Sequence, residues 1–410
     1  MFTAFSTALS ALTADTTAID VVGNNLANLN TTGFKDSSVS FEDLMSQSIG
    51  ASSGSSQVGL GVGAPIITTQ FTQGAIDTTG NPLDVAIQGQ GFYVVTTPAG
   101  ASEYTRAGNF QVNAAGNLTT ATGELVQGWT LSGGTLTTSG PIGPINVPAG
   151  TLAPPLPTKN TSVSLNLNAS ATAGSTFSTS VQIYDSLGTA HTVTYTFTQS
   201  GTANQWNFSA GIPPGDSTPA ATPTTGTLTF DSNGNLISPA AGAPPVIAIT
   251  GLNDGASAMN VNWNLYSQGI SDITQFSQPS ATSAQSQDGS AAASLVSIGI
   301  GNGGQILAQY SNGQQLVAGQ LAMASISNPS TLVEVGDNSY QTSAATALPS
   351  IGLPGTGGRG TILGGSLESS TVDMATEFTN LIVYQRGYEA NAHVITTVDQ
   401  LTQDTINLKQ

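Results

Sequence analysis

Residues 2–29 read FTAFSTALSALTADTTAIDVVGNNLANL, and this stretch predicts a long helix with one apolar stripe. Its large apolar side chains recur at steps of three and four residues, which is the spacing of one helix face. Four of them lie seven residues apart, as in the seam of a coiled coil: Phe5, Leu12, Ile19 and Leu26. Gly33 suits the end of such a helix. We therefore expect an N-terminal helix of about 27 residues.

The other end of the chain repeats this pattern in TVDMATEFTNLIVYQRGYEANAHVITTVDQLTQDTINL, residues 371–408. Its apolar stripe contains Met374, Phe378, Leu381, Tyr388 and Ile395. Ser370 and Asp373 stand where a capping box would begin a helix. A helix of about 38 residues is unusual in a globular domain and suggests a coiled coil.

Two interpretations fit these helices. Each helix could pack on the body of its own domain, or the stripes could be assembly seams that meet helices of the same chain or of neighbouring chains. Outside the stripe both helices are rich in Thr, Asn, Gln and Asp, and the stripe is narrow. This polarity favours the second interpretation, because helices with so little apolar surface need other helices beside them.

The composition excludes some classes of function. The 410 residues contain 6 basic and 23 acidic residues, a net charge of −17, which argues against a nucleic-acid partner. Only 7% of the residues are charged, and Gly, Ser, Thr, Asn, Ala and Gln dominate. Such a surface suits an extracellular repeating assembly, an adhesin or some secreted enzymes.

Membrane insertion and thiol chemistry are also not expected. There is no cysteine, so neither a disulfide nor a zinc–thiolate site can form. No apolar run approaches the ~18 residues that a membrane span needs. The start MFTAFSTALS lacks a basic region and an unbroken apolar core, so we expect export without a cleaved signal peptide.

Between the helices the chain predicts β structure in a nested order. Strand signals begin at Ile66 and Ile67, and apolar residues alternate at Leu83, Val85 and Ile87. Residues 141–157 contain six prolines, as in a linker. A second β unit begins near residue 161, with a hairpin around the turn DSLG at 185–188 and an aromatic core that includes Trp206, Phe208 and Trp263. The polar stretch 277–290 would be the crossing back. If so, residues 141–160 and 277–290 should lie close together.

The predicted fold class is therefore mainly β with long terminal α-helices, in which nested β domains are inserted between N- and C-terminal coiled-coil helices. We expect a terminal helical domain of residues 1–30 and 366–410 and an extended connecting segment of residues 31–75. The outer β domain would comprise residues 76–147 and 286–360, and the inserted β domain residues 148–285.

Residues that could support catalysis or cofactor binding are sparse. Two stretches match G-x-G-x-x-G, at Gly299 and at Gly355, but neither opens a helix in a β-α-β unit. The first fits a hairpin turn around Asn302-Gly303, and the second a hinge. Residues 231–235 resemble a calcium loop but lack its glycine and glutamate, so a turn is expected. The two histidines, His191 and His393, are 202 residues apart. We expect no catalytic residue, no cofactor and no metal.

Each end of the chain carries a recognisable signature. At the N-terminus it consists of Asn24, Asn25, Leu26, Ala27, Asn28, Thr32, Gly33, Phe34 and Lys35, and at the C-terminus of Gln385, Arg386, Tyr388 and Asn391. Together these signatures resemble those of a known family, the flagellar rod and hook proteins. Residues 83–92, 104–108 and 367–368 agree as well. The middle, at 310–313, 319–322 and 328–329, together with the large insertion and the total length, resembles the hook members. Thr371, His393 and Ser327 depart from the usual family residues.

The resemblance implies a structural subunit of the bacterial flagellar hook, not an enzyme. Such subunits form a helical homo-oligomer, a hollow flexible tube that acts as a universal joint, links rod to filament and transmits torque. It also implies extracellular assembly after passage through the flagellar type III export apparatus, with the hook cap, distal rod and hook–filament junction proteins as partners. Two alternatives stay open: a distal rod or other axial protein, and a secreted β-rich adhesin or carbohydrate-active enzyme.

Overall fold

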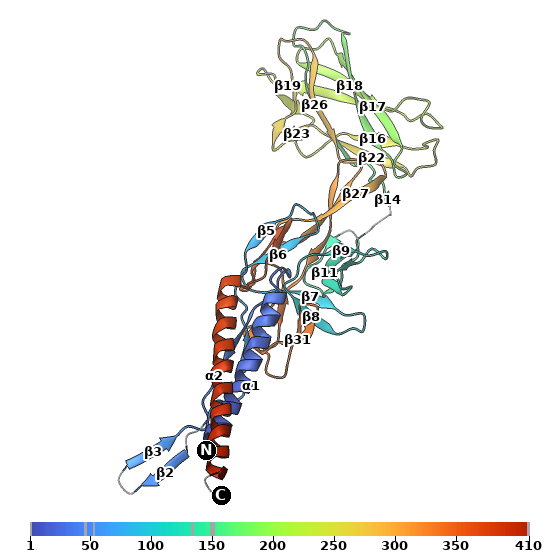
Figure 1. The fold of residues 1–410 in the computed structure, drawn as a ribbon. Helices are drawn as coiled ribbons and strands as arrows, with labels where there is room; N and C mark the ends of the chain where they lie inside the picture. The colour runs from blue at the N-terminus through green and yellow to red at the C-terminus, as the bar shows by residue number, and fades with distance from the viewer. Residues whose placement is uncertain (1, 45–46, 52–53, 133–134, 148–151, 408–410) are drawn as a thin grey trace. The chain divides into compact units, whose positions relative to one another are not determined.

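The computed structural model describes residues 2–44, 47–51, 54–132, 135–147 and 152–407 (Figure 1). The chain divides into two compact units. Unit 1 comprises residues 1–149, 297–308 and 315–410, and unit 2 comprises residues 150–296 and 309–314. The fold is mainly β with terminal helices packed on each other, which confirms the predicted class. The terminal helical domain that the sequence distinguishes falls within unit 1, as does the predicted outer β domain except for residues 286–296 and 309–314, which belong to unit 2.

The two helices of unit 1 form an antiparallel pair. Helix α1 (Phe2–Ala27) and helix α2 (Met374–Asn407) lie side by side, and α1 begins at the end where α2 finishes (Figure 1). Asn391 of α2 contacts Asp15, whereas Glu377, nearer the start of α2, contacts Asn25. Helix α2 is capped by Asp373, whose carboxylate Oδ1 accepts the Thr376 N–H at 2.8 Å. Two long elements far apart in sequence are thus joined in one unit.

The strands of unit 1 build one large sheet and several two-stranded ribbons. The main path of the sheet within unit 1 runs β28-β29-β11-β7-β8-β32-β31, and the ribbons are β1–β4, β2–β3, β5–β35 and β6–β34. The strands are β1 (Ser37–Ser40), β2 (Gln47–Ala51), β3 (Gly54–Val58), β4 (Ile66–Thr69), β5 (Ile76–Thr78), β6 (Val85–Gln88), β7 (Phe92–Thr96), β8 (Ser102–Thr105), β9 (Gln111–Val112), β10 (Leu118–Thr119), β11 (Leu125–Ser132), β12 (Thr135–Leu136), β13 (Gly143–Pro144), β28 (Gln305–Tyr310), β29 (Gln315–Leu321), β30 (Met323–Ser325), β31 (Val333–Gly336), β32 (Ser339–Gln341), β33 (Ser350–Gly352), β34 (Thr361–Gly364) and β35 (Ser366–Glu368).

Strand β7 is buried from Phe92 to Val95 because both of its faces are covered. Tyr93 and Val95 enter one hydrophobic core, whereas Phe92 and Val94 enter another on the opposite face. The preceding Gly89-Gln90-Gly91 turns the chain from β6 into β7. Gly91 has φ +133°, and a Cβ there would lie 2.7 Å from the Met323 Sδ, so this turn requires glycine.

Unit 2 is a sandwich of two sheets around one core. One sheet is the meander β16–β20, and in the other β15 pairs with β22, β25 and β26, while β22 also pairs with β21. Its strands are β14 (Leu152–Ala153), β15 (Asn160–Asn166), β16 (Thr176–Tyr184), β17 (Ala190–Gln199), β18 (Gln205–Gly211), β19 (Thr224–Phe230), β20 (Leu236–Ser238), β21 (Val246–Ile249), β22 (Met259–Asn264), β23 (Tyr266–Ser267), β24 (Ile270–Ser271), β25 (Ile273–Thr274), β26 (Ala281–Gln287) and β27 (Ala293–Ile300), which continues into unit 1.

The predicted hairpin and aromatic core of unit 2 are confirmed. Strands β16 and β17 pair from Thr176–Thr198 to Tyr184–Ala190. Trp206, Phe208 and Trp263 are buried in the core, where the Trp263 ring lies 4.8 Å from that of Tyr195. The strand exposure alternates residue by residue, so each sheet has one buried face.

The entry and exit of unit 2 are adjacent, as the nested order predicts. Leu156 and Ser290 exchange two backbone hydrogen bonds, of 3.0 and 2.8 Å. Leu152 and Ser294 also pair, between β14 and β27. The insertion therefore begins and ends at one point of the chain's path.

Three loop predictions have different outcomes. The interpretation of residues 277–290 as a crossing linker is wrong, because half of this stretch is β26, which pairs with β15 through backbone hydrogen bonds. Its sequence ATSAQSQ has no large apolar residue and lies largely exposed, so it carries no strand periodicity. The Asn302-Gly303 turn between β27 and β28 is confirmed, as is the turn at 231–235.

Candidate assembly surface

Large apolar side chains are exposed along the helix pair. Exposed members on α1 are Phe5 and Leu9, and on α2 they are Met374, Phe378, Ile382, Val383, Tyr388, Val394, Leu401 and Ile406. Phe378 keeps 49% of its surface exposed and Ile406 62%. Single apolar residues scattered on a surface need no explanation, whereas a large contiguous apolar surface is a candidate interaction site.

The predicted seam residues occupy two kinds of position. Phe5, Met374, Phe378 and Tyr388 are exposed, whereas Leu12, Ile19, Leu26, Leu381 and Ile395 are half-buried. The fully buried apolar positions of α1 are instead small or β-branched: Ala8, Ala14, Ala18, Val21 and Val22. The packing of α1 within this chain therefore relies on the smaller side chains and leaves the larger ones partly or wholly accessible.

Asn25 of the N-terminal signature joins three segments. Its side chain is fully buried, and its Oδ1 accepts the Ser37 N–H at 3.0 Å. Its Nδ2 donates to the Ser37 carbonyl at 2.9 Å and to the Glu377 Oε1 at 3.1 Å. Burial raises the pKa of Glu377, although the Asn25 hydrogen bond opposes this shift. Asn25 thus links α1, the strand after it and α2.

Lys35 of the same signature belongs to a buried ionic cluster. Its Nζ lies 2.6 Å from the Glu368 Oε1 and donates to the Thr72 carbonyl. The Arg106 Nη1 lies 3.2 Å from the other Glu368 oxygen, Oε2, and both acidic and basic side chains are almost completely buried. Burial lowers the pKa of Lys35, while the hydrogen bond to Glu368 opposes the shift. This cluster ties the segment after α1 to β35, the strand before α2.

The loop between α1 and β1 fits closely against the body of unit 1. Gly33 has φ +70°, and a Cβ there would lie 2.7 Å from the Arg106 carbonyl carbon. The Asn338 side chain donates to the Thr32 carbonyl at 2.7 Å. Phe34 is buried. Thr371, which departs from the family pattern, bonds both the backbone and the side chain of Asp36, at 2.9 and 2.6 Å.

The remaining signature residues are less buried. Asn28 donates to the Asn24 carbonyl at 3.0 Å, and both residues line a groove of about 500 Å³ beside Thr105 and Asn338. Leu26 is half-buried and Ala27 is exposed. Gln385, Arg386 and Tyr388 are exposed on α2, whereas Asn391 donates to the Asp15 Oδ2 at 3.1 Å. The signature therefore combines buried residues that hold the helices to unit 1, such as Asn25 and Lys35, with residues that stay at the surface.

The sequence does not reveal that the partners of Asn25 and Lys35 lie together in the fold. Arg106 and Glu368 lie in stretches that match the family, but they are separated by 262 residues and no local spacing joins them. Glu377 carries no distinguishing sequence signal, because an acidic residue in the first turn of a helix is ordinary. Within the described residues, neither helix has an apolar stretch long enough to cross a membrane.

Comparisons with known proteins cover both ends and the middle of the chain. Family models match residues 5–35 (flagella basal body rod protein), 86–169 (flagellar hook protein FlgE/F/G D1 domain), 146–290 (flagellar basal body protein FlaE D2 domain) and 363–408 (flagellar basal body rod FlgEFG protein C-terminal).

Full-length relatives and a solved structure agree with these models. The flagellar hook protein FlgE of Salmonella typhimurium is 34% identical over 420 residues, covering 99% of this chain and 100% of the relative. That of Treponema pallidum is 34% identical over 448 residues, covering 96% of each chain. The crystal structure of Helicobacter pylori flagellar hook protein FlgE2 shares the fold, with a TM-score of 0.54 at 16% identity over 72% of this chain and 100% of that one. The chain therefore belongs to the flagellar hook protein FlgE family, as a structural subunit of the hook and not an enzyme.

Proposed function

We propose that this chain polymerises into a hollow, flexible tube that links the flagellar rod to the filament and transmits torque as a universal joint, and that its helix pair supplies subunit contacts. One observation supports the role of the helix pair in subunit contacts. The large apolar side chains of the predicted seams are exposed or half-buried in the isolated chain, while smaller side chains fill the buried positions of α1. A family whose members form a polymer within the flagellum gives these side chains a place to be buried.

The energy available from this surface is substantial. Burying a large apolar side chain completely contributes about 1.5–3 kcal/mol, so burying the exposed half of each contributes roughly 1 kcal/mol. Phe378, Ile382, Leu401 and Ile406 are all about half exposed or more, so several such contributions can add up at each subunit. Because every subunit repeats them, small terms stabilise the whole polymer.

The other proteins that the subunit would contact are inferred from the family resemblance. The subunit would pass through the flagellar type III export apparatus and assemble outside the cell beneath the hook cap. The tube would contact distal rod proteins at its base and hook–filament junction proteins at its tip. Its low charge density, 7% of residues, suits subunits that slide past neighbours, because few fixed ion pairs must break as the tube bends.

The test of the helix surface is a pair of aspartate substitutions on adjacent residues. Phe378→Asp places a carboxylate in the exposed apolar surface, and Thr379→Asp places the same charge on the next exposed residue. In purified protein both should unfold within about 0.5 kcal/mol of the parent, as exposed substitutions do. In cells, Phe378→Asp should prevent hook growth, because a carboxylate buried at each contact has no counter-ion. Electron micrographs showing hooks of normal length for Phe378→Asp would refute the role of this surface.

A deletion strain separates the hook from the alternative axial position. Basal bodies with a complete rod and no hook are expected when the gene is deleted. Basal bodies that lack the distal rod would instead indicate a rod protein.

A further inference from the structure

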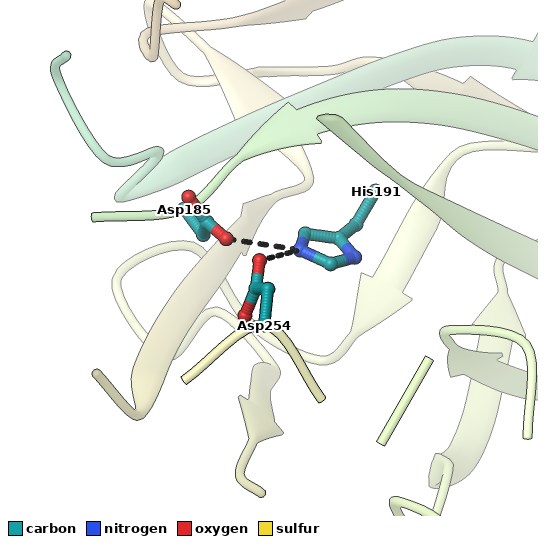
Figure 2. Close-up of side chains that lie close together, drawn as sticks. All are labelled: Asp185, His191 and Asp254. Atoms are coloured by element: carbon teal, nitrogen blue, oxygen red, sulfur yellow. Dashed lines mark hydrogen bonds and ion pairs between the residues drawn. The ribbon is translucent and has the colours of Figure 1, made fainter. Parts of the chain in front are cut away.

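Unit 2 contains a cluster that the hook function does not use. Asp185 follows β16, His191 lies on β17, and Asp254 lies in the loop between β21 and β22 (Figure 2). The His191 Nε2 lies 3.1 Å from the Asp185 Oδ2 and 3.5 Å from the Asp254 Oδ2. The two carboxylates approach one ring nitrogen from different segments. One nitrogen and two oxygen donors thus converge on one point, with all three atoms within 4.8 Å of one another.

We propose that Asp185, His191 and Asp254 bind one divalent transition-metal cation of the Zn²⁺ class, which joins the two sheets of unit 2. A single imidazole with two carboxylates is a donor set that such cations accept. Bond lengths of about 2.0–2.1 Å to a tetrahedral metal place neighbouring ligand atoms roughly 3.3–3.4 Å apart. The observed nitrogen–oxygen separations lie on either side of this value.

Each carboxylate is already oriented by its other oxygen. The Asp185 Oδ1 accepts the N–H groups of Leu187 and Thr189, at 2.8 and 2.9 Å. The Asp254 Oδ1 accepts the Ala256 N–H at 3.0 Å. In both residues this leaves Oδ2 directed at the histidine, so a cation would bind to ligands whose positions are held by the backbone.

The far side of the imidazole is held as well. The His191 Nδ1 lies 3.4 Å from the Oδ2 of Asp216, a residue outside the set of three ligands. A carboxylate that accepts the Nδ1 proton leaves the Nε2 lone pair free for a metal, and this carboxylate–histidine–metal arrangement is common in metal sites. Asp216 also accepts the Asn253 N–H through its carbonyl, next to Asp254.

The charge around the cluster favours a cation. Asp185 is completely buried, and its neighbour Asp254 is 24% exposed. Among the described residues, no lysine or arginine forms an ion pair with Asp185, Asp216 or Asp254, and Lys159 is the only basic residue that the sequence has in 150–296. Two carboxylates directed at one point repel each other unless a positive charge lies between them. The exposed side of Asp254 leaves room for water as a fourth ligand.

No sequence pattern predicts this site. Asp185 and His191 are six residues apart, but Asp254 follows 63 residues later from the opposite sheet. Only the packing of the sandwich brings them together.

The experiment uses the full-length protein, freed of metal with a chelator and titrated with Co²⁺ and then Zn²⁺. One Co²⁺ per chain should bind with the visible absorption of a tetrahedral site, and Zn²⁺ should displace it. Zn²⁺ should also raise the unfolding temperature of unit 2 within the full-length chain and leave that of unit 1 unchanged, because the cation links the two sheets of unit 2. Absence of a saturable Co²⁺ signal would overturn the proposal.

Variants assign the ligands. Asp254→Asn keeps the oxygen that accepts the Ala256 N–H but weakens the metal ligand, and His191→Gln removes the imidazole; each should lower the Co²⁺ affinity at least tenfold. Asp216→Asn should lower it by roughly 10–100-fold through the ring orientation. Asp231→Asn, which changes a half-buried carboxylate in the turn after β19, is the matched control and should bind as the parent does. Equal affinity in His191→Gln and the parent would overturn the assignment even if metal binds.

Discussion

Replacing Glu368 by glutamine should destabilise unit 1 more than any exposed charge change. Glu368 accepts hydrogen bonds from Lys35 at 2.6 Å, from Arg106 at 3.2 Å and from the Gly74 N–H at 2.8 Å, and it is fully buried. The amide would leave two buried cations without their counter-charge. Removing one member of a buried ion pair in this way costs about 3–5 kcal/mol.

Lys35→Met is the informative comparison. It leaves Glu368 with Arg106 and the Gly74 N–H, so the carboxylate keeps one cation and one backbone donor. The expected cost is smaller, about 1–3 kcal/mol for the lost partner of a buried group. The double variant should be less destabilised than the sum of the two, because the methionine removes the cation that the amide leaves unpaired.

The assay is thermal unfolding of the purified full-length chain. Unit 2 has its own core and should unfold with an unchanged transition, so it is an internal reference. For a unit of this size about 1 kcal/mol shifts the midpoint by roughly 2–4 °C, so Glu368→Gln should lower the unit 1 transition by roughly 6–20 °C. Glu389→Gln, an exposed residue of α2, should leave it unchanged. If Glu368→Gln lowers the unfolding midpoint of unit 1 no more than Lys35→Met does, Glu368 is not the shared counter-charge of Lys35 and Arg106.

Three further predictions use the same melting assay. Burial raises the pKa of Glu377 above 4.5, so the folded state holds its proton to higher pH than the unfolded state. The protonated Glu377 side chain therefore stabilises the fold at low pH, and this stabilisation is lost as pH rises through the folded-state pKa. In Glu377→Gln the unfolding temperature should fall less over this pH range than in the parent. The same pH dependence in the variant and the parent would contradict this prediction. Gly33→Ala should cost about 1–3 kcal/mol from its positive φ, with more from the clash at Arg106, whereas Gly140→Ala, with open space around it, should be neutral. The fragment 155–291, closed by the Leu156–Ser290 pair, should unfold cooperatively alone, and gradual melting would show that it depends on unit 1.

The sequence could predict the fold wherever periodicity follows burial. Phe5 to Leu26 carried a helix signal, and the alternation from His191 to Phe197 carried a strand signal, because one face of each element is apolar. Strand β26 was missed because its hydrogen bonds to β15 come from the backbone, which is the same for every residue type.

The candidate site was predicted less completely than the fold. The signature around Asn25 and Lys35 could be recognised as a pattern, but its physical role depends on Glu368 and Glu377, which are far away in the chain. The exposure of the apolar stripe could not be predicted either. Periodicity identifies which side chains share a face, whereas only packing shows whether the same chain covers that face.

The paired strands at the entry and exit of unit 2 also bear on rotation. A domain held by one chain segment can spin freely about that segment, as on a swivel, because single backbone bonds rotate. Unit 2 is held by two segments that pair at Leu152 with Ser294 and at Leu156 with Ser290. One full turn of the unit would wind these segments around each other and break the pairs between them. In the torque-transmitting tube that we propose, this pairing would keep unit 2 from rotating about a single connecting segment.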